Sequence, residues 1–196
     1  MYVPLHYQVS EYDCVPTALI NAVSYLFPRE DIPPMVIQHI YLYCLDTVGR
    51  NSRIGIGGTS KYAVRLVGNW LSSYKMKRFS VRTQFLGREK VNLEAAGGIQ
   101  ACLDTGGVAL CNIFLTPREE HYLMIMEGDE DWVYCFDSYR RVSIRGMQDN
   151  VKILDSGDGR APNLQIKRNW LAQAEKKRFC FGPRRTREAL LLWSTY

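Results

Sequence analysis

Apolar residues recur at helical spacing in the first third of the chain. The clearest such segment covers residues 14–27, with five apolar side chains on one face: Ala18, Leu19, Ala22, Val23 and Leu26. Two further helices are predicted over about 33–45 and 59–71, the second with Thr59 as its N-cap. A fourth helix is predicted over about 93–104, because Gly106 and Gly107 supply a stop signal after it.

From residue 79 onward the pattern changes to alternating or continuous short apolar runs, which are typical of strands. Strands are predicted over seven segments: 79–85, 108–115, 121–127, 132–137, 142–145, 177–181 and 189–193. Residues 128–131 have the composition of a hairpin turn. Residues 46–58 and 149–163 are predicted to be loops.

Helices therefore come first and mostly antiparallel strands follow, which favours an α+β fold with a cleft between a helical part and a sheet part. The chain has 196 residues, the usual size of one domain. We expect a single domain over residues 1–196, with the helical part at about 1–75 and the sheet part at about 76–196. No internal repeat or low-complexity tract interrupts it.

The composition, 46% hydrophobic and 23% charged, excludes a disordered or fibrous protein. No apolar run approaches the roughly 20 residues of a membrane span. The first residues also lack the basic and apolar regions of a secretory signal. These features predict a cytoplasmic protein without a membrane-spanning segment.

The net charge of +5 is concentrated near the C-terminal end. Residues 152–196 carry 10 basic and 4 acidic side chains, whereas residues 1–151 carry 15 and 16. Such a cluster could attract an acidic partner or nucleic acid. No nucleic-acid-binding motif accompanies it, so a solvated surface is the favoured interpretation and no nucleic-acid partner is expected.

The six cysteines are scattered, and no two lie closer than nine positions. Zinc sites usually contain close pairs of Cys or His, and small disulfide-rich domains are shorter and denser in cysteine. The sequence therefore predicts six free thiols, with no metal and no organic cofactor.

Cys14 is the cysteine in a position to act as a nucleophile. Asp13 stands where an N-cap belongs, and Pro16 is tolerated only in the first turn, so the helix must begin near Cys14. A helix N-terminus stabilises a thiolate through its partial positive charge and free N–H groups. The other cysteines fall inside predicted apolar elements and are interpreted as core residues: Cys44, Cys102, Cys111, Cys135 and Cys180.

A thiolate also needs an imidazole that returns a proton to the leaving group. His6 and His39 are assigned ordinary structural roles, whereas His121 opens a strand after a polar turn. Asp137 ends the next strand and is the candidate that orients His121. If paired residues have numbers that sum to 258, His121 and Asp137 face each other on the same side of the sheet; a slip of one residue would separate them.

Acyl transfer further needs donors aimed at the developing oxyanion. The backbone N–H of Cys14 is one candidate. The side-chain amide of Gln8, six residues upstream, is the second.

These segments resemble the bacteriocin-processing, double-glycine leader peptidase-like family of the papain-like cysteine peptidases. The resemblance covers about residues 5–145. The matching stretches are Gln8 to Leu19 with Asn21, Gly58-Thr59-Ser60, Ile99 to Leu110, His121 to Met126, and Phe136 to Tyr139. It implies a papain-like fold that cleaves a peptide or protein substrate, with Cys14 as nucleophile, His121 as general base and acid, Asp137 as its orienter and Gln8 as oxyanion donor.

The chain departs from the family at two positions, with Val15 where glycine is usual and Ser138 where proline is common. Two alternatives stay open. The same site could serve an amidase, deamidase or acyltransferase through a thioester, because fold does not settle the reaction. The chain could also be a non-catalytic peptide-binding relative, in which the four residues have structural roles.

Overall fold

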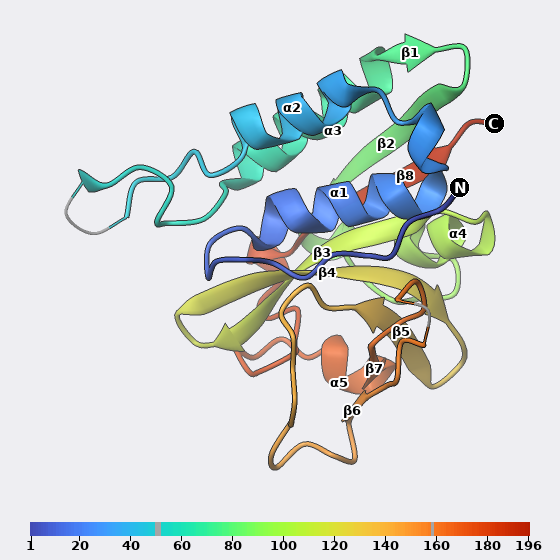
Figure 1. The fold of residues 1–196 in the computed structure, drawn as a ribbon. Coiled ribbons are helices and arrows are strands. Elements are labelled where there is room, and N and C mark those ends of the chain that lie inside the picture. Colours follow the sequence, from blue (N-terminus) through green and yellow to red (C-terminus); the bar gives the residue numbers. More distant parts are fainter. Residues whose placement is uncertain (50–51, 158) are drawn as a thin grey trace.

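The computed structural model describes residues 1–49, 52–157 and 159–196 (Figure 1). Its main helices are α1 (Cys14–Leu26), α2 (Pro34–Tyr43), α3 (Lys61–Ser73), α4 (Gly98–Asp104) and α5 (Arg168–Leu171). The strands are β1 (Lys75–Met76), β2 (Phe79–Gly87), β3 (Val108–Thr116), β4 (Glu119–Gly128), β5 (Trp132–Phe136), β6 (Val151–Ile153), β7 (Leu164–Lys167) and β8 (Glu188–Ser194). The predicted α+β class is confirmed.

The strands form one antiparallel sheet in the order β1-β2-β8-β3-β4-β5-β7-β6. Successive side chains of a strand point to opposite faces, so each central strand supplies two cores. Leu110, Met124 and Leu192 pack with the apolar faces of α1, α2 and α3. Ala109 and Ile125 face the other way and pack with α4 and α5. The sheet is therefore covered by helices on both faces, with α1 lying across β3 and β4 (Figure 1).

The close approach of α3 to the sheet depends on a glycine. A Cβ on Gly68 would lie 2.7 Å from Leu190 Cδ1 on β8, too close for a side chain. Gly106, with φ of +76°, ends α4 in the left-handed conformation, as its stop signal predicts. α3 begins at Lys61 with Ser60 as its cap, one residue later than predicted, because Asp46 holds Ser60 and the Ser60 hydroxyl accepts from Ala63 N–H.

Several element predictions in the second half of the chain are wrong. Residues 142–145 and 177–181 are not strands, although Cys180 makes a single bridge to Phe114 of β3. The predicted loop over 149–163 contains β6, and β7 and α5 were not predicted. These elements are only three or four residues long, and their partners lie far away in sequence, so local periodicity does not identify them. Of the predicted loop 46–58, positions 50 and 51 lie outside the described residues.

All six cysteines carry free thiols, and only the Cys14 side chain is partly exposed. In the part of the chain that the structure describes, no helix has the length and apolar character to cross a membrane.

Candidate active site

Cys14 is the first residue of α1, as predicted, and Pro16 lies in the first turn of that helix. Asp13 occupies the N-cap position, but its carboxylate does not cap the helix. It accepts instead from Val9 N–H (3.1 Å), Ser10 N–H (2.9 Å) and the Ser10 hydroxyl (2.7 Å), which fixes the turn before the helix. Pro16 has no N–H and Thr17 N–H donates to the Asp13 carbonyl, so the N–H groups of Cys14 and Val15 are left for another acceptor beside the thiol.

His121 lies on β4 and is 4% exposed. Its Nε2 donates to Asp137 Oδ1 at 2.7 Å, which leaves Nδ1 as the nitrogen that can serve the Cys14 thiol, and this thiol lies near enough to interact with the imidazole. Burial acts to lower the pKa of His121, but the interactions with Asp137 and Cys14 outweigh it and raise that pKa to about 9. The imidazolium is therefore favoured at neutral pH.

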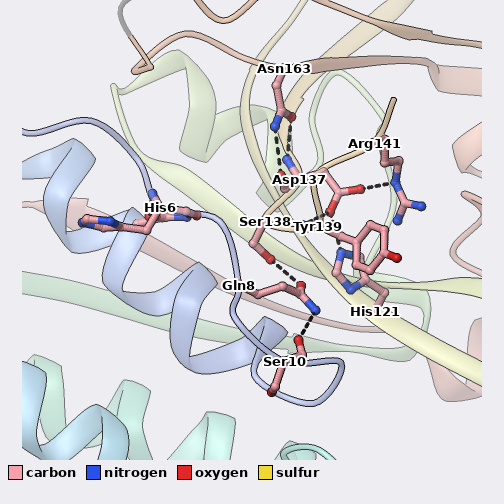
Figure 2. Close-up of polar contacts among 10 residues, drawn as sticks. His6, Gln8, Ser10, His121, Asp137, Ser138, Tyr139, Arg141 and Asn163 are labelled. Carbon is pink, nitrogen blue, oxygen red and sulfur yellow. Dashed lines mark hydrogen bonds and ion pairs between the residues drawn. The ribbon is translucent and has the colours of Figure 1, made fainter. Parts of the chain in front are cut away.

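Asp137 follows β5 and is 1% exposed, with both carboxylate oxygens in use (Figure 2). Besides His121, Oδ1 accepts from Tyr139 N–H at 2.9 Å, and Oδ2 accepts from Arg141 Nε. Burial alone raises the pKa of Asp137, but the bonds and positive charges of His121 and Arg141 lower it below its usual range. Asp137 is thus a carboxylate that holds one imidazole nitrogen in place.

Asn163 fixes the backbone at this position. Its Oδ1 accepts from Asp137 N–H at 2.8 Å and its Nδ2 donates to the Asp137 carbonyl at 2.9 Å. This pair of bonds replaces the strand pairing that ends with β5. Sequence reasoning missed Asn163 and Arg141. Asn163 is 26 residues from Asp137 in a stretch predicted to be loop, so no local signal marks it, whereas the i, i+4 spacing of Asp137 and Arg141 was a weak one.

The predicted register between β4 and β5 is wrong by two residues. Met124 pairs with Phe136 and Ile125 with Cys135, so paired numbers sum to 260, and Asp137 falls opposite Leu123 by extension. Because the offset is even, it keeps His121 and Asp137 on the same face of the sheet. β4 also begins at Glu119, so His121 is its third residue and not its first.

Gln8 lies beside these groups, held between two serines (Figure 2). The Ser138 hydroxyl donates to Gln8 Oε1 at 2.9 Å, and Gln8 Nε2 donates one hydrogen to the Ser10 carbonyl at 2.7 Å. The Ser10 carbonyl accepts only, so it fixes which end of the amide is nitrogen. The backbones also meet, with Gln8 N–H donating to the Ser138 carbonyl at 2.9 Å. The second Nε2 hydrogen remains for an oxyanion, and this role of Gln8 stays a prediction.

Ser138, which stands where the resembled family commonly has proline, therefore holds the Gln8 amide in place. Ser138→Ala should lower kcat about five- to tenfold with little change in KM, since it removes one hydrogen bond that fixes the amide. Steady-state kinetics with a cleaved peptide measure this. Ser143→Ala, the same change at an exposed position nearby, is the control. An unchanged kcat in Ser138→Ala would separate Gln8 from catalysis.

A cleft of about 1100 Å³ brings together three of the predicted residues, Gln8, Cys14 and His121. Val15 also borders it, but its side chain is 1% exposed and belongs to the core. The other two histidines do not line the cleft. The ring of His39 stacks on Trp70 at 4.1 Å, and that of His6 points away from His121 (Figure 2).

Arginine side chains from the C-terminal basic region also reach the cleft, namely Arg178 and Arg185. Arg187 does not: it is buried, and its guanidinium donates to the carbonyls of Gly182, Val91 and Ala172. The region is thus only in part the solvated surface that the sequence favoured. Across residues 1–49, 52–157 and 159–196, no three His, Cys, Asp or Glu side chains are grouped to hold a metal ion.

Chemically, the arrangement combines a partly exposed thiol, an imidazole near enough to interact with it and a carboxylate that holds the imidazole. Such a set can form a thioester with a carbonyl substrate. In comparisons with known proteins, no family model matches the chain, and no curated protein resembles it at a significant level.

Proposed function

We propose that the chain is a papain-like cysteine peptidase that cleaves peptide bonds through a thioester on Cys14. One observation carries the proposal: the buried imidazole of His121 bonds to a carboxylate and also lies near enough to a thiol at a helix N-terminus to interact with it. The family resemblance of the surrounding sequence supports the same assignment.

In this mechanism the Cys14 thiolate attacks the carbonyl carbon of the scissile bond. The oxyanion accepts from the backbone N–H of Cys14 and from Gln8 Nε2. His121 Nδ1–H then protonates the leaving amine, which departs and leaves a thioester. Water attacks the thioester as His121 removes its proton, and the carboxylic acid product and the thiolate are released. Asp137 keeps the imidazole in line throughout.

The dimensions of the cleft support a peptide as substrate. Its volume of about 1100 Å³ lies at the upper limit of small-molecule pockets, which hold roughly 300–1000 Å³. Its walls come from α1, β3, β4 and β8 and from the loop before α3, so an extended chain has contacts on both sides of the thiol.

Iodoacetamide should modify Cys14 at least about 10²-fold faster than the other five cysteines. Those five are buried, and burial raises the pKa of Cys44 and Cys102 to about 12 and that of Cys180 to about 11. Mass spectrometry of the digested protein locates the label. Cys180→Ala is the matched control and should retain full labelling at Cys14. Equal labelling of all six thiols would contradict the proposal.

Activity itself is tested with a mixture of peptides, in which mass spectrometry detects new chain ends. Wild-type protein should produce them and Cys14→Ala should not. Ammonia release or amine exchange without chain cleavage would assign the thioester to an amidase, deamidase or acyltransferase. Peptide binding that Cys14→Ala leaves unchanged, without turnover by the wild type, would indicate a binding protein.

A further inference from the structure

One wall of the cleft contains a row of polar side chains that the proposed mechanism does not use. Tyr122 on β4 pairs with Asn112 on β3, and the pairing of Cys111 with Ala189 places Glu188 of β8 next along the row. All three residues line the cleft with Cys14. Tyr122 is close enough to Cys14 for the two to interact electrostatically.

The Glu188 carboxyl group is buried but has few hydrogen-bond or ion-pair partners. The residue is 8% exposed, and its Oε1 accepts a hydrogen bond from the Tyr122 hydroxyl. It makes no ion pair within 4.0 Å with any residue that the structure describes. A buried carboxylate without a cation is costly. Burial accordingly raises the pKa of Glu188, and the nearby Glu120 adds to this.

Asn112 contributes a second unsatisfied acceptor. It is 6% exposed, and its Nδ2 donates to Glu120 Oε2 at 2.9 Å. Its Oδ1 is buried and has no hydrogen-bond partner within the described parts of the chain. Such a group calls for a donor. Two acceptors on the same wall, one of them an acid, fit a group that carries several N–H donors and a positive charge.

Among the lysine and arginine side chains that line the cleft, Lys61 at the start of α3 is the one that affects Glu188; the others are Arg118, Arg141, Arg178 and Arg185. Lys61 lies near enough to lower the pKa of Glu188 slightly against the effect of burial, yet its ammonium group remains beyond ion-pair distance. Lys61 is exposed, whereas Glu188 is buried and lines the cleft. A ligand cation could therefore reach Glu188 from the cleft.

We propose that Glu188, Asn112 and Tyr122 form a specificity pocket beside Cys14 for a cationic side chain, lysine or arginine, of the peptide substrate. The inference rests on the proposed peptidase function. An ammonium or guanidinium group there would pair with Glu188 and donate to Asn112 Oδ1. Arginine, with its planar set of five donors, can meet both acceptors at once.

The first test compares peptides that differ at one position near the scissile bond, carrying arginine, lysine, citrulline or norleucine. At one position, wild-type kcat/KM should be at least about tenfold higher for arginine or lysine than for its neutral counterpart. Glu188→Gln keeps the shape and an acceptor for Tyr122, and should abolish that preference. Glu130→Gln, an exposed change away from the cleft, is the control.

A second test does not require turnover. Methanethiosulfonate reagents with an aminoethyl (cationic) or an ethyl (neutral) group modify Cys14 directly. The cationic-to-neutral rate ratio should fall at least threefold in Glu188→Gln but not in Glu130→Gln. If no peptide is cleaved but the ratio falls, the pocket stands and the peptidase proposal fails.

The opposite outcome is equally distinct. If peptides are cleaved through Cys14 but the wild type shows no cationic preference at any position, the pocket proposal is wrong and the peptidase proposal stands. A preference that Glu188→Gln leaves unchanged would also overturn it. The wild-type comparison needs no variant, so poor folding of Glu188→Gln would not prevent the test.

Discussion

Replacing His121 with alanine is expected to lower kcat/KM by about 10²- to 10⁴-fold, the range for loss of a general acid and base. The thiol would lose the imidazolium that stabilises its ionised form and the proton that releases the leaving amine. Initial rates of peptide cleavage measure the effect. His39→Ala, which removes a ring stacked on Trp70 outside the cleft, is the control and should retain activity.

The pH profile supplies a second readout for the same histidine. The reactive pair needs imidazolium, and because the pKa of His121 is raised to about 9, kcat/KM should decline as pH rises through about 9. Asp137→Asn should move the alkaline decline to lower pH, since the carboxylate helps to raise the pKa of His121. An unmoved decline, or full activity in His121→Ala, would contradict the mechanism.

Asp137→Ala is expected to destabilise the fold by about 3–5 kcal/mol, because it leaves the buried groups of His121 and Arg141 without their shared carboxylate. The side chains of these two residues are 5% and 8% exposed, so water cannot replace the lost partner. Urea unfolding measures the difference. Asp149→Ala, at an exposed position, is the control and should change stability by less than about 0.5 kcal/mol.

The destabilisation should depend on pH with a defined sign. The folded-state pKa of Asp137 is lowered, so its contribution is complete above the unfolded value of about 3.9 and is lost as pH falls. The folded-state pKa of His121 is raised, so its contribution to stability is complete below about pH 6.5 and is lost as pH rises through about 9. The difference in the free energy of unfolding between wild type and Asp137→Ala should therefore be largest between about pH 4 and 6.5. A difference in unfolding free energy that does not change with pH would indicate a packing defect instead.

The position of Cys14 could be predicted from the sequence because the signals are local. The apolar face of α1 and the place of Pro16 together fix where the helix starts. His121 and Asp137 could be placed on one face because the error in the predicted register was an even number of residues. The side-chain bond of Asp13 was not predictable in the same way, since it depends on the shape of the preceding turn.

The groups that support these residues could not be predicted. Ser138 meets Gln8 across 130 residues, and Asn163 meets Asp137 across 26, so both contacts arise from the packing of loops. Glu188 reaches the cleft because β8 lies between β2 and β3, a placement that no local pattern specifies. Short elements such as β6, β7 and α5 are equally hard to predict from sequence, since their stability comes from packing against neighbouring elements and not from intrinsic propensity.

The position of β8 in the sheet also affects when the cleft can form during synthesis. Although it is the last strand in sequence, it joins β2 to β3 inside the sheet and carries one wall of the cleft. When Cys14, His121 and Asp137 of a growing chain have left the ribosome, β8 is still missing from the sheet. Strand pairings between residues far apart in sequence also form slowly. Under the proposed function, the nascent polypeptide should therefore be inactive until β8 has left the ribosome.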